Sequence, residues 1–329
     1  MRSLVTGGCG FIGSHLVESL LALGHEVTIF DNLVSGRLEN IKAFKDNPKL
    51  HFCNVDIRNP SEVDKNFKDY DWVFHLAALA DIVPSIEQPE SYFNTNVSGT
   101  FNMLEVARKN NIKRFIYVAS SSSYGIAKKL PTPESEAIYS LYPYALTKHM
   151  GEELVLNWDK IYGLKTISLR LFNVYGPKSR TTGAYGAVFG VFLAQKINNK
   201  PFTVVGDGTQ TRDFTYVSDV CDALILSAQS EESGVFNVGS GSHHSINKLV
   251  ELLGATSVIY IPKRPAEPNS TFADITKIKE KLNWKPKVKF EDGVKKLLMH
   301  LDLWKDAPLW DEKSIEEATR SWFKYFNKL

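Results

Sequence analysis

Short apolar runs alternate with amphipathic stretches through the first half of the chain. Strands separated by helical stretches at this spacing indicate βαβ units and a parallel sheet covered on both faces. We therefore expect an α/β fold with a doubly wound sheet. The apolar runs predict strands at Ser3–Thr6, Glu26–Phe30, Leu50–Cys53, Trp72–Leu76, Phe115–Ala119 and Thr166–Phe172, and the amphipathic stretches predict helices at about Phe11–Leu23, Tyr92–Asn110 and Tyr144–Tyr162.

The regular alternation is lost after Pro177, where glycines punctuate shorter elements and residues 263–268 read as a loop. We predict one domain over residues 1–176 and a smaller α/β lobe over 177–329, with some of the chain crossing back. The stretch from Asp302 onward carries Trp304, Trp310 and Trp322 and is too aromatic for a disordered tail. We expect it to pack on the body or on a partner subunit.

Composition and charge narrow the classes of protein. The 329 residues include 39 Lys+Arg and 37 Asp+Glu, a net charge of +2, with no long run of like charges. This balance argues against a nucleic-acid partner bound by bulk electrostatics. There is no apolar stretch of membrane-spanning length and no room for a signal peptide before the first glycines. Cys9, Cys53 and Cys221 are far apart and lack metal-ligand spacing, so we expect a cytoplasmic protein without metal or membrane.

A glycine motif follows the first predicted strand and opens the first predicted helix. Gly7, Gly10 and Gly13 have GxxGxxG spacing, with Phe11 and Ile12 between the last two. A tight turn, close backbone approach to a pyrophosphate and close helix–strand packing all require the absence of a Cβ. The helix N-terminus then offers N–H groups and partial positive charge to a diphosphate. Structural turn glycines explain such a triplet about as well when it stands alone.

Residues after the next strands supply the other groups that a dinucleotide needs. Asp31 ends the second strand, where its carboxylate can accept the adenosine-ribose hydroxyls and repel the extra phosphate of NADP; the alternative is a turn or cap residue. Asp56 and Ile57 follow the third strand and could hold the adenine edge. Leu76, Ala77 and Ala78 follow the fourth with little bulk, whereas His75 is predicted to be a buried, hydrogen-bonded histidine.

Tyr144 and Lys148 are four residues apart and so share one face of a predicted helix. A nearby ammonium and a positive nicotinamide ring would favour the phenolate, making Tyr144 a plausible base for a hydroxyl proton. Ser120 begins a serine run at the carboxyl end of the fifth strand, the edge that faces the ligand crevice in open α/β sheets. A lone YxxxK pair is usually an exposed helical pair, and a serine run is often a turn.

Taken together, the motifs resemble the extended short-chain dehydrogenase/reductase family, the NAD-dependent nucleotide-sugar epimerases and dehydratases, and within it UDP-hexose 4-epimerases most. The resemblance runs nearly end to end and implies a Rossmann-type domain with a substrate lobe. Its motifs here are the glycine turn, Asp31-Asn32-Leu33, residues 75–78, 96–100 and 120–125, the Tyr144/Lys148 pair, and residues 170–177 and 206–214.

The resemblance also assigns roles to residues. It implies catalysis by Ser120, Tyr144 and Lys148, with NAD as the cofactor and a nucleotide-diphosphate sugar as the substrate. It implies a homodimer formed through the two long helices as a four-helix bundle, although their apolar faces could equally serve the internal core. The implied NAD-binding residues are Gly7, Gly10, Phe11, Ile12, Gly13, Asp31, Asn32, Asp56, Ile57, Leu76, Ala77, Ala78, Tyr144 and Lys148.

On the substrate side, Asn173 and Arg212 match positions that grip the diphosphate. Arg264 and Glu267 match an arginine and an acidic residue that hold the diphosphate and the nucleoside ribose. This agrees with the chemistry, since an Arg fork suits phosphate and a carboxylate suits a diol. Arg212 could instead be a surface ion-pair residue, and the loop alone would account for Arg264 and Glu267.

The residues after Ser120 distinguish between reactions. Related 4,6-dehydratases carry an acidic residue or pair there, whereas this chain has Ser121 and Ser122, which cannot transfer the C5 proton. We therefore favour 4-epimerisation through a 4-keto intermediate, with a 4,6-dehydratase or a C4 dehydrogenase as alternatives. Asp81 departs from related epimerases; it could be an acid/base group, and we favour a cap of the following segment. The tract 178–186 also resembles only some branches and suggests a loop that closes over the substrate.

The rival from another class is a non-catalytic NAD-binding sensor. Loss of Ser120, Tyr144 or Lys148 would have favoured it, and all three are present. A redox sensor would also need a reactive cysteine. Cys9 lies within the glycine turn, where a small side chain is the simpler explanation.

Overall fold

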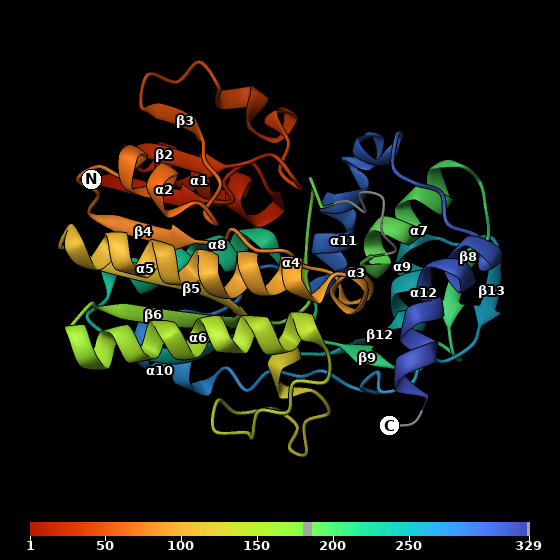
Figure 1. Ribbon diagram of the computed structural model, residues 1–329. Coiled ribbons are helices and arrows are strands. Elements are labelled where there is room, and N and C mark those ends of the chain that lie inside the picture. The colour runs from red at the N-terminus through yellow and green to blue at the C-terminus, as the bar shows by residue number, and fades with distance from the viewer. Residues whose placement is uncertain (180–185, 328–329) are drawn as a thin grey trace.

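The computed structural model describes residues 1–179 and 186–327. Its centre is a seven-stranded sheet whose paired strands are all parallel, in the order β11-β6-β5-β4-β1-β2-β3 (Figure 1). This confirms the α/β prediction, and the predicted strands agree with the observed ones to within a residue or two. The strands are β1 (Arg2–Thr6), β2 (Glu26–Asp31), β3 (Leu50–Asn54), β4 (Trp72–His75), β5 (Arg114–Ser120), β6 (Thr166–Leu171) and β11 (Gly234–Val238).

Helices cover both faces of this sheet, because strands buried on two sides need apolar cover on both. Helices α5 and α6 lie side by side across one face (Figure 1), where their apolar residues share a core with α2. Helices α1 and α8 pack together on the other face. The bounds are α1 (Phe11–Ala22), α2 (Pro60–Asn66), α5 (Gly99–Lys109), α6 (Pro143–Tyr162) and α8 (Val217–Gln229), with short 3-10 helices at Leu38–Phe44 (η1) and Ser121–Tyr124 (η3).

The helix predicted over Tyr92–Asn110 is present but divided. Helix α4 (Pro89–Phe93) runs into a π-helical turn at Asn94–Ser98 (η2), and α5 continues from Gly99. The preceding helix α3 (Ile82–Glu87) was not predicted. Pro84 and Pro89 interrupt the periodicity of this region, which explains why no helix was expected before Tyr92.

The second half builds a smaller lobe but does not stay within it. Strand β11 and helix α8 return to the main sheet, so the chain does cross back over the predicted boundary. Three two-stranded sheets complete the lobe: β7 (Val174–Tyr175) with β10 (Thr215–Tyr216), β9 (Thr211–Arg212) with β12 (His244–Ser245), and β8 (Phe202–Val205) with β13 (Val258–Ile261). Its helices are α7 (Val188–Ile197), α9 (Ile246–Leu253), α10 (Thr276–Leu282), α11 (Phe290–Leu298), η4 (Leu301–Trp304) and α12 (Glu312–Phe326).

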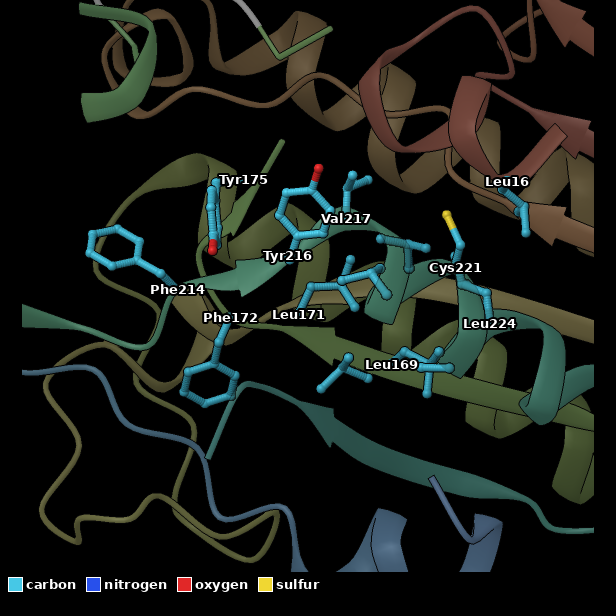
Figure 2. Packing of buried hydrophobic residues seen from close by; sticks show 14 of the residues in the cluster. Leu16, Leu169, Leu171, Phe172, Tyr175, Phe214, Tyr216, Val217, Cys221 and Leu224 are labelled. Atoms are coloured by element: carbon cyan, nitrogen blue, oxygen red, sulfur yellow. The ribbon is translucent and has the colours of Figure 1, made fainter. Parts of the chain in front are cut away.

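One apolar core joins the two parts. Figure 2 shows Cys221 and Leu224 of α8 between Leu16 of α1 and Leu169 of β6. The same cluster continues into the stacked rings around Tyr175, which pair with Phe189 at 4.7 Å. Among the described residues, no helix is both long and apolar enough to cross a membrane.

Candidate active site

The glycine turn has the shape that the sequence predicted. Gly7 has a φ of +71°, and a Cβ there would lie 2.9 Å from the backbone nitrogen of Ala77. A Cβ on Gly13 would collide with the Gly7 carbonyl oxygen. Gly10 is the N-cap of α1 and no side chain caps this helix. The turn therefore leaves the helix N-terminus open to an anion, as a dinucleotide diphosphate requires.

Asp31 lies at the end of β2 directly beside this turn. Its carboxylate accepts hydrogen bonds from the backbone N–H of Cys9 at 2.9 Å and of Leu33 at 2.8 Å, one on each oxygen. Each oxygen retains a lone pair for a ribose hydroxyl. Burial raises the pKa of Asp31, against the two backbone hydrogen bonds. The carboxylate thus both shapes the turn and fits a diol.

The residues expected around the adenine differ in how much of each a ligand can reach. Asp56 pairs with Arg58 at 2.5 Å. This hydrogen-bonded pair, with other hydrogen bonds, lowers the pKa of Asp56 to about 2 against the opposing effect of partial burial. The Asn32 side-chain amide donates to Asp56 at 3.2 Å, so these two side chains are held next to each other. Ile57 is buried in the core under α5, so only its backbone is available to a ligand.

His75 is buried and doubly hydrogen-bonded, as expected. Its Nδ1 lies 2.8 Å from the Thr6 hydroxyl and its Nε2 lies 3.0 Å from the Thr100 hydroxyl. Burial lowers the pKa of His75 to about 3, so the ring is neutral. The Thr6 oxygen also accepts from the N–H groups of Leu76 and Ala77, which fixes the backbone that passes the glycine turn.

A cavity of about 560 Å³ lies at the carboxyl ends of the central strands and reaches into the second lobe. Its walls include Ile12, Leu76 and Ala78 on the cofactor side, and Ser120, Tyr144 and Lys148 beyond them. The Ser120 hydroxyl accepts from the Ser122 N–H at 3.2 Å and lies 2.8 Å from the Ser122 hydroxyl. The fold thus brings all three predicted catalytic residues to one cavity.

Tyr144 and Lys148 have different surroundings in the structure. Burial raises the pKa of Tyr144, the Ser120 hydroxyl opposes this as a hydrogen-bond partner, and the Asp81 charge adds to it. The Lys148 ammonium instead lies over the Tyr117 ring, 4.4 Å from its centroid, and burial lowers its pKa to about 7. Desolvation is the largest cause of both pKa shifts. The prediction that Lys148 and a positive nicotinamide ring together favour the phenolate stays a prediction.

An ion pair missed by the sequence reasoning supports this helix. Glu152, one turn after Lys148, pairs with Arg170 of β6 at 2.5 Å and accepts from the Ser168 hydroxyl at 2.7 Å. Both members of the pair are buried, and these partners lower the pKa of Glu152 to about 2 despite its burial. The pair holds α6 against the sheet, so the Tyr144–Lys148 face has a set position.

The second lobe supplies Arg212, Arg264 and Glu267 of the predicted substrate-binding residues. Arg212 donates to Glu267 at 2.8 Å, and Arg264 lies 3.8 Å from the other oxygen of the same carboxylate. All three side chains line the cavity, so Arg212 is not a surface ion-pair residue. Asn173 also lines it and accepts a 2.8 Å hydrogen bond from the Thr271 hydroxyl. This places two guanidinium groups and a carboxylate at one end of the cavity.

Asp81 is not the cap that we favoured. It precedes α3, but its side chain makes no capping hydrogen bond, and its backbone has φ 87° and ψ 133°. Asp81, Ser121 and Ser122 all line the cavity. The tract 178–186 lies largely outside the described residues, which exclude 180–185.

Two aromatic wall residues were not predicted. Tyr142 stacks on Tyr144 with centroids 6.5 Å apart, and Trp322 of α12 packs on Tyr142 at 6.2 Å. Tyr142 is only two residues from Tyr144, so its proximity was readable from the sequence. Trp322 is far away along the chain, and only its aromatic surroundings hinted that α12 packs back on the body.

Comparisons with known proteins identify relatives of this chain. A family model described as GDP-mannose 4,6 dehydratase matches residues 4–297. A putative UDP-glucose 4-epimerase from Methanocaldococcus jannaschii is 37% identical over 302 residues, covering 90% of this chain and 96% of that protein. The chain therefore belongs to the family of NAD-dependent nucleotide-sugar epimerases and dehydratases, which also includes decarboxylases.

Two solved structures show the same fold at similar identity. One is the UDP-N-acetylglucosamine 4-epimerase of Methanobrevibacter ruminantium M1 in complex with UDP-N-acetylmuramic acid, with a TM-score of 0.87 and 36% identity over 92% of this chain and 98% of that one. The other is the UDP-glucuronic acid 4-epimerase of Bacillus cereus in complex with UDP-glucuronic acid and NAD. It has a TM-score of 0.85 and 31% identity, covering 92% of this chain and 99% of that one.

Proposed function

We propose that this enzyme is a 4-epimerase of UDP-linked hexoses or N-acetylhexosamines that works through a 4-keto intermediate. The observation that carries the proposal is the cavity that holds Ser120, Tyr144 and Lys148 together and presents only serines at positions 121 and 122. The M. jannaschii and M. ruminantium relatives, both called 4-epimerases of UDP-sugars, support the choice of nucleotide and reaction.

NAD fits the residues of the first domain. The glycine turn has no room for a Cβ, the start of α1 is uncapped, and Asp31 has free lone pairs beside it. Gly7, Gly10, Gly13 and Asp31 would hold the diphosphate and the adenosine ribose, Asn32 and Asp56 would flank the adenine, and Lys148 would hold the nicotinamide ribose. Bound NAD would supply a reversible hydride acceptor beside C4 of the sugar.

The chain's own residues manage the proton and the orientation. The Tyr144 oxygen would take the proton of the C4 hydroxyl as C4 loses its hydride. The Ser120 hydroxyl would form a hydrogen bond with the C4 oxygen. The Tyr144 phenolate would be favoured by the positive charge of bound NAD, against the desolvation that raises the pKa of this phenol. In the second half of the reaction Tyr144 would return its proton to the C4 oxygen as C4 regains a hydride on its other face, which would give the epimer without a further acid or base.

The second lobe would anchor the nucleotide while the sugar turns over. Arg212, Arg264 and Asn173 would bind the diphosphate, and Glu267 would accept the nucleoside ribose hydroxyls while it orients both arginines. A 4,6-dehydratase remains the second candidate because Asp81 places one carboxyl group in the cavity. Although the side chain is exposed at the cavity wall, partial desolvation there raises the pKa of that carboxyl.

The test is to incubate the purified protein with UDP-, GDP-, CDP- and dTDP-hexoses in deuterated water and to examine products by mass spectrometry and NMR. We expect an isomer of unchanged mass without carbon-bound deuterium, formed from UDP-sugars. Loss of water with deuterium at C5 would establish dehydration instead, and a released 4-ketone with stoichiometric NADH would establish a dehydrogenase.

We also propose a homodimer formed through α5 and α6. These helices lie side by side on one face (Figure 1), and Phe101, Leu146, Ile161 and Tyr162 are exposed on them. Apolar side chains gathered on two neighbouring helices are what a four-helix bundle interface requires.

A further inference from the structure

Contacts on two sides hold the segment that carries Asp81. The Tyr92 hydroxyl contacts the carbonyl oxygens of both Ala80 and Asp81, the latter at 2.9 Å. On the other side, α3 packs against α12, with Val83 and Trp322 in one apolar cluster. The backbone of Asp81 is thus held from two directions at positive φ, a conformation that costs free energy for any residue with a Cβ.

The Asp81 side chain is exposed at the cavity wall. Within residues 1–179 and 186–327, no side chain or backbone group makes a hydrogen bond or ion pair with it. It lines the cavity close enough to Tyr144 for its charge to raise the pKa of that phenol. Strain and an unpartnered carboxyl at one residue indicate a role toward a ligand.

The cationic side chains that line the cavity have partners within the protein. Arg212 and Arg264 face the carboxylate of Glu267, and Lys148 lies over Tyr117 on the cofactor side. Of these charged groups, Asp81 is the one whose charge raises the pKa of Tyr144. A hydroxyl can donate to such a carboxylate, whereas a second carboxylate brought out of water beside it is repelled.

We propose that Asp81 is a specificity-determining residue, which accepts a hydrogen bond from the C6 hydroxyl of the sugar and excludes sugars that carry a carboxylate at C6. This inference rests on the proposed function and narrows its substrates to hexoses uncharged at C6. It separates this enzyme from relatives such as the B. cereus enzyme, which is named for UDP-glucuronic acid.

The experiment compares UDP-glucose and UDP-N-acetylglucosamine with UDP-glucuronic acid on the NAD-loaded enzyme. Binding is measured by calorimetry, and turnover by NMR. For the wild type we expect binding of a neutral sugar at least 100-fold tighter than that of UDP-glucuronic acid. Asp81→Asn should reduce this ratio at least 10-fold, because the neutral sugar binds more weakly and UDP-glucuronic acid is no longer repelled. Glu90→Gln, which replaces an exposed acid on α4, should leave the ratio unchanged.

Asp81→Gly guards against a folding artefact, because glycine accepts the positive φ and should not lower Tm. Equal binding of uronate and neutral sugar by the wild type, or an unchanged ratio in both Asp81 variants, would overturn the proposal. So would a variant that binds with the wild-type ratio but has lost turnover, since that outcome makes Asp81 an acid/base group. If no nucleotide sugar binds at all, the proposed function itself fails.

Discussion

The indole N–H of Trp322 donates a 2.8 Å hydrogen bond to the carbonyl oxygen of Pro265, which precedes the cavity residues Ala266 and Glu267. The same indole lies under the Arg264 guanidinium at 5.4 Å and packs on Tyr142. Helix α12, which lies beyond the segment matched by the family model, therefore supports the wall of the cavity in the second lobe.

Replacing Trp322 with Leu should weaken substrate binding without affecting NAD. Removal of the indole frees the Pro265 carbonyl and leaves Arg264 without its aromatic contact. We expect KM for the nucleotide sugar to rise about tenfold, the effect of losing one hydrogen bond and its packing. Tyr325→Leu, on the exposed side of the same helix, is the matched control. A Trp322 variant with the wild-type KM would show that α12 has no part in the site.

Tyr144→Phe should abolish most turnover and leave cofactor binding intact. The phenyl ring keeps the stacking on Tyr142, while the hydroxyl that accepts the substrate proton is lost. We expect kcat to fall by about 10²–10⁴, as for the loss of a general base. Stopped-flow kinetics of the NAD-loaded variant would measure this loss, with NAD affinity by calorimetry as the control. Activity within a few-fold of the wild type would refute Tyr144 as the base.

Asp31→Asn should relax the preference for NAD over NADP. The amide oxygen can still accept a backbone hydrogen bond beside the glycine turn, but the charge that repels a 2′-phosphate is gone. We expect the ratio of the two dissociation constants to shift at least tenfold toward NADP, with weaker NAD binding. Glu26→Gln, at the exposed start of the same strand, controls for charge alone. An unchanged ratio would exclude the proposed contact with the ribose.

Lys148→Met should stabilise the protein in the absence of NAD. The pKa of Lys148 is about 7 in the folded protein and 10.5 in the unfolded chain. Between these two pH values the unfolded chain therefore binds more protons than the folded protein. The cost of burying the ammonium is complete below pH 7 and disappears as the pH rises toward 10.5. We expect Tm to increase by at least about 2 °C at pH 6, the effect of about 1 kcal/mol, and by less at pH 10. Lys160→Met, exposed on the same helix, should show no such pH dependence.

The dimer is tested through Phe101 of α5. We expect light scattering to give twice the chain mass of 37.0 kDa for the wild type. Phe101→Glu places a charge among the exposed apolar residues of α5 and α6 and should yield monomers, whereas Leu23→Glu, exposed after α1, should not. A wild-type monomer, or a Phe101→Glu dimer, would place the interface elsewhere or remove it.

The three cysteines do not support a redox sensor. Burial together with the Asp31 charge raises the pKa of Cys9 to about 12, and burial also raises the pKa of Cys53 and Cys221. Because the thiolate is the reactive form, these thiols are unreactive at neutral pH. The small side chain of Cys9 is explained by its packing in the glycine turn.

Local signals were enough for most of the first domain. Residues 6–13 form one strand–turn–helix unit, and Tyr144 and Lys148 lie one turn apart on one helix, so spacing along the chain already determines their local geometry. The sequence by itself therefore determined the main sheet, the glycine turn and the shared helix face of Tyr144 and Lys148.

Tertiary structure decided what depends on contacts between distant segments. The protonation of Tyr144 and Lys148 follows from desolvation by elements such as β5, and so could not be read from their spacing. Asp81 became a cavity residue because Tyr92 and α12 hold its backbone in a strained conformation, where a local pattern indicated a cap. Burial and long-range packing create these environments, and the local sequence around Tyr144, Lys148 and Asp81 does not indicate them.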